Sequence, residues 1–269
     1  MIQVSHEVPI SLLEESRSFN DYDYCLVHLW DDEHPVYKKF FQESLAQGRK
    51  VLLDNSVFEL GTAFREEVYA QRIKELKPTW YVVPDVLSDC DKTISNMDHW
   101  LQKYQDLPGI IMGCIQGKTF EEMAKCYAYM AGNPQVGKIG IPFRSVAYDT
   151  MFSSYEDPLY RWYHGRRAMI KYLVDQHIWN NEKPHHLLGA SYVREFAYDL
   201  YRQLNIDTLD TSSPVTCGIT GVVYTETGNP SKPQVKLCEL IQYSPTEQEQ
   251  ALMNYNINIF KKLLNESLD

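Results

Sequence analysis

Long hydrophobic runs are missing from this chain of 269 residues, and their absence excludes one class of protein. No stretch reaches the roughly eighteen consecutive apolar residues of a membrane-spanning helix, so we expect no membrane partner. The first residues also lack the basic and apolar regions of a secretory signal. The sequence therefore predicts a cytoplasmic protein.

Cysteines are few and scattered. The chain has six, and no two are close enough to form a CxxC pair. Structural metal sites and redox motifs usually need such pairs. We therefore expect reduced, buried thiols, no metal site and no cofactor. The six residues are Cys25, Cys90, Cys114, Cys126, Cys217 and Cys238.

Basic residues are outnumbered, with 26 Lys and Arg against 36 Asp and Glu, a net charge of −10. This balance argues against non-specific nucleic-acid binding by the chain as a whole, but it permits a local basic groove. The densest basic stretch contains Arg161, Arg166, Arg167 and Lys171, and Arg144 follows another apolar run. Arg144, Arg166 and Arg167 are the candidate nucleic-acid contacts. The alternatives are a solvated helix face for the stretch and a salt bridge for Arg144.

Linkers rich in Gly, Pro or Ser are also missing, and short apolar runs alternate with helical segments instead. Most of these runs are continuous rather than alternating, as in strands buried on both faces of a parallel sheet. The alternation predicts an α/β fold, a TIM-type (β/α)8 barrel formed by one domain over residues 1–269. We expect strands at 25–30, 50–55, 80–85, 109–116, 138–143, 185–190 and 206–210.

The eighth strand is the uncertain part of this barrel. Residues 213–243 have the composition of a loop and a hairpin insertion, with 227–233 as the turn. We expect the eighth strand to lie within this stretch or to be irregular.

Helices are expected between the strands. Apolar spacing predicts them at 64–77 and 89–104. Capping boxes, Thr119 with Glu122 and Thr246 with Glu249, open two more. Ser191 is a candidate N-cap for a helix over 192–204.

Four polar residues lie at or near the C-terminal ends of separate apolar runs: Asp54, Asp85, Gln116 and Asp210. In a parallel barrel the active site forms at this end of the strands. The four side chains are therefore predicted to converge in one acidic pocket. Taken singly, Asp54 or Asp85 could equally cap a following helix, and Gln116 could be a loop amide.

The segments around these residues resemble the tRNA-guanine transglycosylase family, whose members insert 7-deazaguanines by base exchange. The family has Asp-Ser-Gly-Gly-aromatic-Gln, a later Asp, Gly-x-x-Gln-Gly, a Gly-rich strand end, Leu-Met-Gly and Phe-Asp-x-x-x-Pro. The resemblance covers residues 50–214. The matching segments are Asp54–Glu59, Pro84-Asp85, Cys114–Gly117, Lys138–Pro142, His186–Gly189 and Asp207–Pro214.

The resemblance implies a role for each matched residue. Asp210 would attack C1′ of the sugar and form a covalent intermediate, and Asp54 would act as general acid and base. Asp85, Gln116 and the backbone N–H near Gly140 would recognise the base. The base would stack between Phe58 and Leu188, beside Gly189. Phe58 alone could equally be a core residue.

This chain departs from the tRNA enzymes in several places. It lacks their zinc-binding Cys-x-Cys-x-x-Cys segment, and it is shorter after the nucleophile segment. The Gly-Gly of the family is replaced by Ser56-Val57. These differences make the chain similar to compact, zinc-free phage enzymes that place 7-deazaguanines in DNA. Such enzymes must flip the target guanine out of a duplex.

The resemblance therefore implies a guanine/7-deazaguanine transglycosylase whose partners are a free 7-deazaguanine base and nucleic acid, with DNA favoured over tRNA. Three alternatives remain open: a minimal enzyme acting on tRNA, a nucleoside hydrolase-like barrel enzyme, and a non-catalytic transglycosylase subunit. The inserted base, the sequence context and a homodimer are also open.

Overall fold

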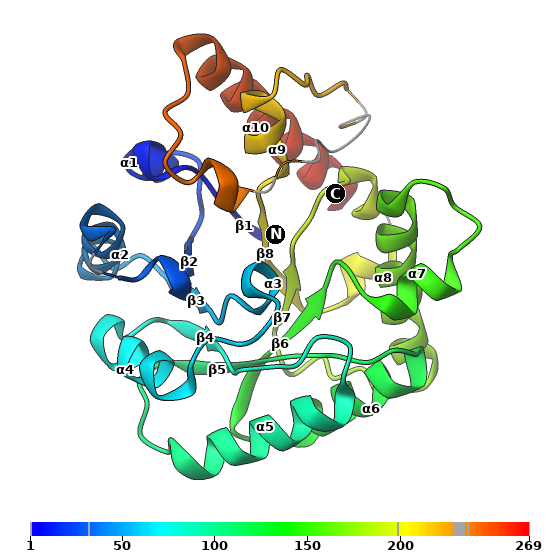
Figure 1. Cartoon of the computed structure of the whole chain (residues 1–269). Coiled ribbons are helices and arrows are strands. Elements are labelled where there is room, and N and C mark those ends of the chain that lie inside the picture. The colour runs from blue at the N-terminus through cyan, green and yellow to red at the C-terminus, as the bar shows by residue number, and fades with distance from the viewer. Residues whose placement is uncertain are drawn as a thin grey trace.

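The computed structural model describes residues 2–31, 33–197, 199–226, 228, 235 and 237–268, except the side chains of residues 238, 239, 267 and 268. Eight parallel strands form one sheet that curves into a nearly closed barrel, with helices around its outside (Figure 1). The predicted (β/α)8 TIM-type fold is confirmed.

The strands pair in the order β1-β8-β7-β6-β5-β4-β3-β2. Seven of them, β2 to β8, overlap the predicted strands. Their bounds are β1 Gln3–His6, β2 Asp23–Leu26, β3 Val51–Asp54, β4 Trp80–Val82, β5 Ile110–Cys114, β6 Val136–Pro142, β7 His185–Leu188 and β8 Ile206–Thr211.

The prediction for the remaining strand was wrong. It is β1 at the start of the chain, and it is regular: Gln3 to His6 pair in parallel with Thr208 to Thr211 of β8. The four-residue strand has the sequence QVSH, with Val4 as its one apolar residue, so it lacks the continuous apolar run by which the others were found.

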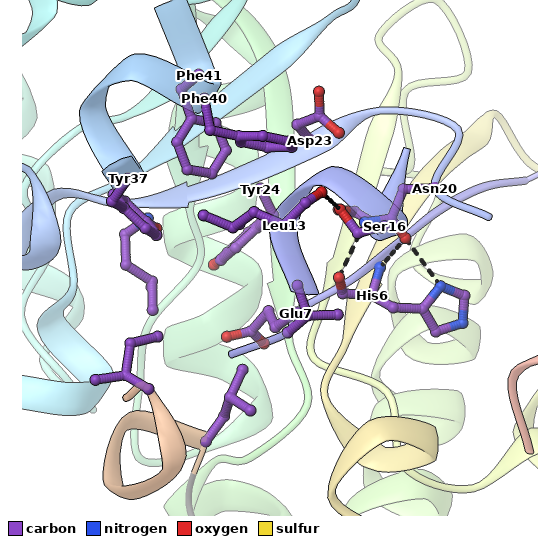
Figure 2. Close-up of a pocket in the computed structure, with 15 residues that line it drawn as sticks. His6, Glu7, Leu13, Ser16, Asn20, Asp23, Tyr24, Tyr37, Phe40 and Phe41 are labelled. Carbon is purple, nitrogen blue, oxygen red and sulfur yellow. Dashed lines mark hydrogen bonds between the residues drawn. The ribbon is translucent and has the colours of Figure 1, made fainter. Parts of the chain in front are cut away.

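The barrel has a seam between β1 and β2, which are the two ends of the strand order. Residues just before β2 bridge it. Asp21 donates its N–H to the Val4 carbonyl at 2.9 Å and accepts the Val4 N–H at 2.8 Å. The Asn20 side chain bonds both the N–H and the carbonyl of His6 (Figure 2). Side chains thus replace part of a strand ladder here.

Helices cover the outer face of the barrel. As predicted, Thr119 caps α6, accepting an N–H with its side chain, and Thr246 pairs with Glu249 at the start of α10. The side chain of Asp89 caps α5 in the same way. The α-helices are α1 Leu13–Ser16, α2 Pro35–Ala46, α3 Val57–Leu60, α4 Glu66–Leu76, α5 Cys90–Lys103, α6 Phe120–Gly132, α7 Val146–Met151, α8 Pro158–Asp175, α9 Ser213–Ile219 and α10 Glu247–Leu268.

Two predictions for the C-terminal third were wrong. Residues 192–204 form two short 3-10 helices, η3 Val193–Glu195 and η4 Asp199–Gln203, and no side chain caps η3. The start of the expected hairpin insertion is instead the buried helix α9, which packs on α10. Most of the expected turn at 227–233 lies outside the described residues. The remaining 3-10 helices are η1 Ile10–Leu12, η2 Val27–Leu29 and η5 Leu237–Leu240.

The barrel interior is a separate core from the one between strands and helices. Its apolar centre consists of Tyr22, Leu52, Trp80, Val82, Met112 and Cys114. Lys138 is also fully buried there, with Nζ 4.9 Å from the centre of the Trp80 ring and paired with Asp207. Asp207, whose side chain is 38% exposed, is the partner of this buried lysine. Because this layer is filled, any ligand must bind above it, at the C-terminal ends of the strands.

Among the helices of the described residues, none is both long and apolar enough to cross a membrane.

Candidate active site

A cavity of about 710 Å³ opens at the C-terminal ends of the strands. All eight strand ends, or the residues just after them, contribute to its wall, as do α3 and the start of α8. Its polar lining is mainly acidic. The titratable lining residues are Glu7, Tyr24, Asp54, Glu59, Asp85, Cys114, Arg144, Asp157 and Asp210.

Asp210, near the end of β8, is held from one side. Its Oδ1 accepts the Gly189 N–H at 2.9 Å and a hydrogen bond from His186 Nε2 at 2.9 Å. Among the described residues no hydrogen bond is made to Oδ2, and the side chain lines the cavity. The carboxylate is therefore fixed in orientation with one oxygen available to a ligand.

The imidazole of His186 is neutral when it hydrogen-bonds Asp210. Burial lowers the pKa of His186, although the hydrogen bond to Asp210 opposes this shift. A neutral imidazole has one N–H, and a carboxylate can only accept. His186 therefore donates from Nε2 and accepts at Nδ1, 2.9 Å from Thr208 Oγ1.

Gly189 owes its contact with Asp210 to its backbone conformation. Its φ is +67°, in the left-handed region where other residues are strained. This turn directs the N–H of Gly189, just after β7, toward Asp210. An alanine at this position could adopt the same conformation only with backbone strain.

Asp54, the last residue of β3, has different surroundings. Its Oδ2 accepts the Ser56 N–H at 2.7 Å. Burial raises the pKa of Asp54 well above its usual value, and the charges of Glu59, Asp85 and Asp210 add to this. The group therefore keeps its proton to higher pH than an ordinary carboxyl and is suited to proton transfer.

The Ser56 backbone is left-handed, with φ at +57°. The resembled family has its first glycine at this position. Ser56 adopts the strained conformation although it is not a glycine, and its side chain is fully buried. The departure in sequence therefore preserves a glycine-like turn after Asp54.

Asp85, three residues after β4, is bonded on both oxygens. Oδ1 accepts from Asn55 Nδ2 at 2.7 Å, and Oδ2 accepts from Gln116 Nε2 at 2.6 Å. Gln116 Oε1 in turn accepts the Ser88 N–H at 2.9 Å. Burial raises the pKa of Asp85, while these bonds oppose that shift. The four predicted strand-end residues thus line one cavity, and two of them are bonded to each other.

Phe58, Leu188 and Gly189 also line this cavity, as predicted for residues around a base. Phe58 has 53% of its surface exposed, so it is not a core residue. Gly140 does not line the cavity: it lies within β6, paired with Cys114 and His186. A Cβ there would approach Leu188 Cδ1 to 2.9 Å, so Gly140 makes room for that side chain.

The three arginines predicted to contact nucleic acid lie in different environments. Arg144 is exposed on the cavity wall, 5.2 Å from the centre of the Trp162 ring. Arg167 is partly buried on α8 and does not line the cavity. The prediction for Arg166 was wrong, because its guanidinium is fully buried and bonds both oxygens of Glu195 at 2.6 and 2.8 Å.

Sequence reasoning missed several residues of the site, among them Glu7, Tyr24 and Glu59. Burial, and then the charges of Asp54 and Asp210, raise the pKa of Tyr24 well above its usual value, so the phenol keeps its proton. Glu7 directly follows β1, a strand the sequence did not indicate, and Tyr24 lies within β2 rather than at a strand end. Glu59 could have been found, since it stands at the family's Gln position in the matched segment.

A smaller cavity of about 20 Å³ lies at the β1–β2 seam, with room for about one water molecule. Glu7, Tyr24, Leu26 and Leu237 line both it and the larger cavity. Figure 2 shows Glu7 and Tyr24 beside Leu13 in this seam.

The fold and the cavity define an α/β-barrel protein with an acidic site at the C-terminal ends of its strands. Among the described residues, no group of three or more His, Cys, Asp or Glu side chains is arranged to hold a metal ion.

No protein-family model matches the chain, and no curated protein matches it. Among solved structures, a variant of the citrate synthase SbnG is similar with a TM-score of 0.44 and 12% identity, covering 78% of this chain and 84% of that one. A similarity this low carries no argument about function.

Proposed function

We propose that the protein is a transglycosylase that replaces guanine in DNA with a 7-deazaguanine through a covalent intermediate on Asp210. The observation that carries the proposal is the state of this carboxylate, which is held by two hydrogen bonds on Oδ1 while Oδ2 is available. Asp54, whose raised pKa suits a proton donor, lines the same cavity.

The first half-reaction breaks the bond between guanine and the sugar. Asp210 Oδ2 forms a bond to C1′ as the C1′–N9 bond breaks through an oxocarbenium-like state. The bonding electrons leave with the guanine, and Asp54 gives it a proton. The His186 and Gly189 donors keep the nucleophile oriented throughout.

The second half-reaction reverses these roles. The N9–H of the incoming 7-deazaguanine gives its proton to ionised Asp54, N9 attacks C1′, and the C1′–Oδ2 bond breaks. Two inversions at C1′ retain the configuration of the sugar.

Asp85 and Gln116 are proposed to recognise the base. Each Asp85 oxygen has a lone pair beyond the one used by Asn55 or Gln116, so the carboxylate can still accept from the N1–H and amino group of guanine. The second N–H of Gln116 donates to Cys114 Sγ at 3.6 Å, a weak bond that O6 of guanine would replace. Phe58 and Leu188 supply apolar surface on which a flat ring can stack.

The choice of DNA rests on the sequence, which lacks the zinc-binding segment of the tRNA enzymes. The proposal requires the target guanine to leave the duplex before it enters the cavity.

The test is exchange of labelled guanine into duplex DNA, single-stranded DNA and tRNA. We expect label in DNA with the wild type, none with Asp210→Asn, and wild-type exchange with Asp106→Asn, an exposed carboxylate outside the cavity. Wild-type protein should also form a denaturation-resistant adduct with DNA that Asp210→Asn lacks.

The other outcomes identify the alternatives. Label in tRNA alone would indicate the minimal tRNA enzyme, and release of guanine without exchange would indicate a hydrolase. Exchange that depends on a partner protein and survives Asp210→Asn would indicate a non-catalytic subunit.

A further inference from the structure

Leu87 is an apolar residue at the mouth of the large cavity that the proposed reaction does not use. Among the exposed large apolar residues of the described chain, Phe58 and Leu87 line the cavity, with 53% and 41% of their surfaces in solvent. Phe58 is already proposed to stack on the base. Because Leu87 is both exposed and part of the lining, it lies where the cavity opens to solvent.

Leu87 lies at the tip of a tight turn between β4 and α5. The Asp89 N–H donates to the Val86 carbonyl at 3.0 Å, so Leu87 and Ser88 are the two central residues of the turn. Ser88 has a left-handed backbone, with φ at +60°. Strained residues of this kind are concentrated at functional sites. Gly, Pro and small polar residues dominate such turns, so the turn itself does not require a leucine at its tip.

The turn is tied to the elements on both sides of it. The buried Thr93 of α5 accepts the Val86 N–H with Oγ1 at 3.0 Å and donates to the Val86 carbonyl at 3.2 Å. On the other side, the Ser88 N–H donates to Gln116 Oε1 at 2.9 Å. Leu87 is therefore exposed on a fixed backbone, which is bonded to the amide proposed to bind the base.

The acids beside the turn are paired with lysines. Asp89 lies 2.9 Å from Lys92. Asp91 lies 2.6 Å from Lys125. The hydrogen bond from Lys92, and further the charge of the exposed Lys118, lower the pKa of Asp89. A phosphate backbone can therefore approach this part of the rim, although the chain as a whole has a net charge of −10.

A guanine that leaves a duplex leaves a gap in the base stack. Enzymes that flip a base must overcome the loss of stacking and pairing. Proteins that hold DNA unstacked frequently insert an apolar side chain, leucine among them, between the base steps. Such a side chain must be exposed, held on a rigid backbone, and placed beside the pocket that receives the base. Leu87 meets these three conditions.

We propose that Leu87 enters the gap that the flipped guanine leaves in duplex DNA and keeps the guanine from returning to its partner. Leu87 lies two residues after Asp85, so one short segment would both recognise the base and fill its place. This inference rests on the proposed function and adds to it the step that makes a paired guanine available. A single strand has no such gap between paired neighbours, so Leu87 matters for the duplex alone.

The test compares exchange of labelled guanine into duplex DNA with exchange into the same DNA after heat denaturation. Leu87→Ala is expected to lower kcat/KM for the duplex about threefold to tenfold, the effect of losing the burial of part of a leucine side chain. Exchange into the single strands should stay at the wild-type rate. Leu87→Met should keep most of the duplex activity, because methionine is apolar and similar in volume.

Leu60→Ala is the matched control. Leu60 is 46% exposed on α3 and does not line the cavity, so its truncation should leave exchange into both forms of DNA unchanged. Both alanine variants should unfold at the wild-type temperature, since neither leucine is buried. Thermal unfolding checks this and separates a loss of exchange from a loss of folded protein.

Three results would overturn the inference and leave the proposed function standing. The first is wild-type duplex exchange in Leu87→Ala. The second is an equal loss with duplex and single strands, which would mean that Leu87 contacts the base inside the cavity. The third is a duplex-specific loss of the same size in Leu60→Ala. If wild-type protein exchanges guanine into neither form of DNA, the proposed function is rejected and this inference with it.

Discussion

Asp54 and Asp210 are the same residue type at equivalent strand ends, and their neighbours give them different properties. Asp210 accepts two hydrogen bonds on one oxygen, from His186 and Gly189. Asp54 accepts one from a backbone N–H and lies near further carboxylates, which with burial raise its pKa. Such differences in environment commonly give two carboxylates of one site different catalytic roles.

Removing the His186 donor should slow the reaction more than it weakens base binding. A hydrogen bond to a charged group contributes about 1.5–3 kcal/mol, which corresponds to roughly a tenfold to hundredfold loss of kcat in His186→Leu. His186→Gln offers a replacement N–H and should recover part of the rate. Single-turnover exchange, alongside the Kd for guanine, measures both. Equal losses in kcat and guanine affinity would mean that His186 shapes the cavity instead of positioning Asp210.

Replacing Asp54 with Asn should change how stability depends on pH. An unfolded chain ionises this group near pH 4, whereas the folded protein keeps the proton to higher pH because the pKa is raised. The contribution of Asp54 to stability is therefore full below about pH 4 and is lost as pH rises toward the folded pKa.

Asp54→Asn stays neutral throughout and should be more stable than the wild type at pH 8, with the difference shrinking toward pH 4. Urea unfolding at both values measures it. A difference that is independent of pH would contradict the raised pKa.

At the scale of elements, α8 has two structural roles. Its first turns place Leu159 and Trp162 in the cavity wall, while the buried Arg166 ties the helix to the end of β7. The guanidinium donates to the Leu188 and Gly189 carbonyls at 3.1 and 2.8 Å and pairs with Glu195 of η3. The helix therefore supports the turn whose N–H holds Asp210.

Arg166→Ala should destabilise the protein by about 3–5 kcal/mol, because it leaves the fully buried Glu195 carboxylate without its partner. Arg166→Lys should rescue little, since an ammonium cannot reproduce the two parallel bonds. Thermal or urea unfolding tests this. A variant of normal stability that has lost only DNA affinity would restore Arg166 as a nucleic-acid contact.

At the scale of the whole molecule, the barrel is held by strand ladders everywhere except at the β1–β2 seam, where Asn20 and Asp21 bridge to β1. Residues of the seam also line both cavities. An edge held by a few bonds opens more readily than strands paired on both sides.

Native-state hydrogen exchange should therefore be faster for amides of β1 and β2 than for those of β5 and β6. Asp21→Ala should accelerate exchange in β1 specifically, because Val4 loses a partner for its N–H. The control is Asp98→Ala, a carboxylate on α5 bonded to Tyr129, which should leave β1 unchanged. Uniform protection across the eight strands would show that the seam does not open first.

The sequence by itself determined the barrel and the acidic ends of its strands. Continuous apolar runs ending in Asp54, Asp85, Gln116 and Asp210 can be buried on both faces only in a parallel sheet, whose strand ends then meet. Local signals were also sufficient for the caps at Thr119 and Thr246.

Only the tertiary structure decided which groups act on those residues. The donors to Asp210 come from β7 and the turn after it, and Asp85 and Asp210, whose charges help raise the pKa of Asp54, follow or lie in other strands. β1 is found by its pairing with β8 rather than by its own pattern. Likewise, Arg166 looked like a surface charge because its partner, Glu195, is 29 residues away. Burial and long-range contacts set the pKa of Asp54 and the tautomer of His186, and neither is encoded in any local stretch of chain.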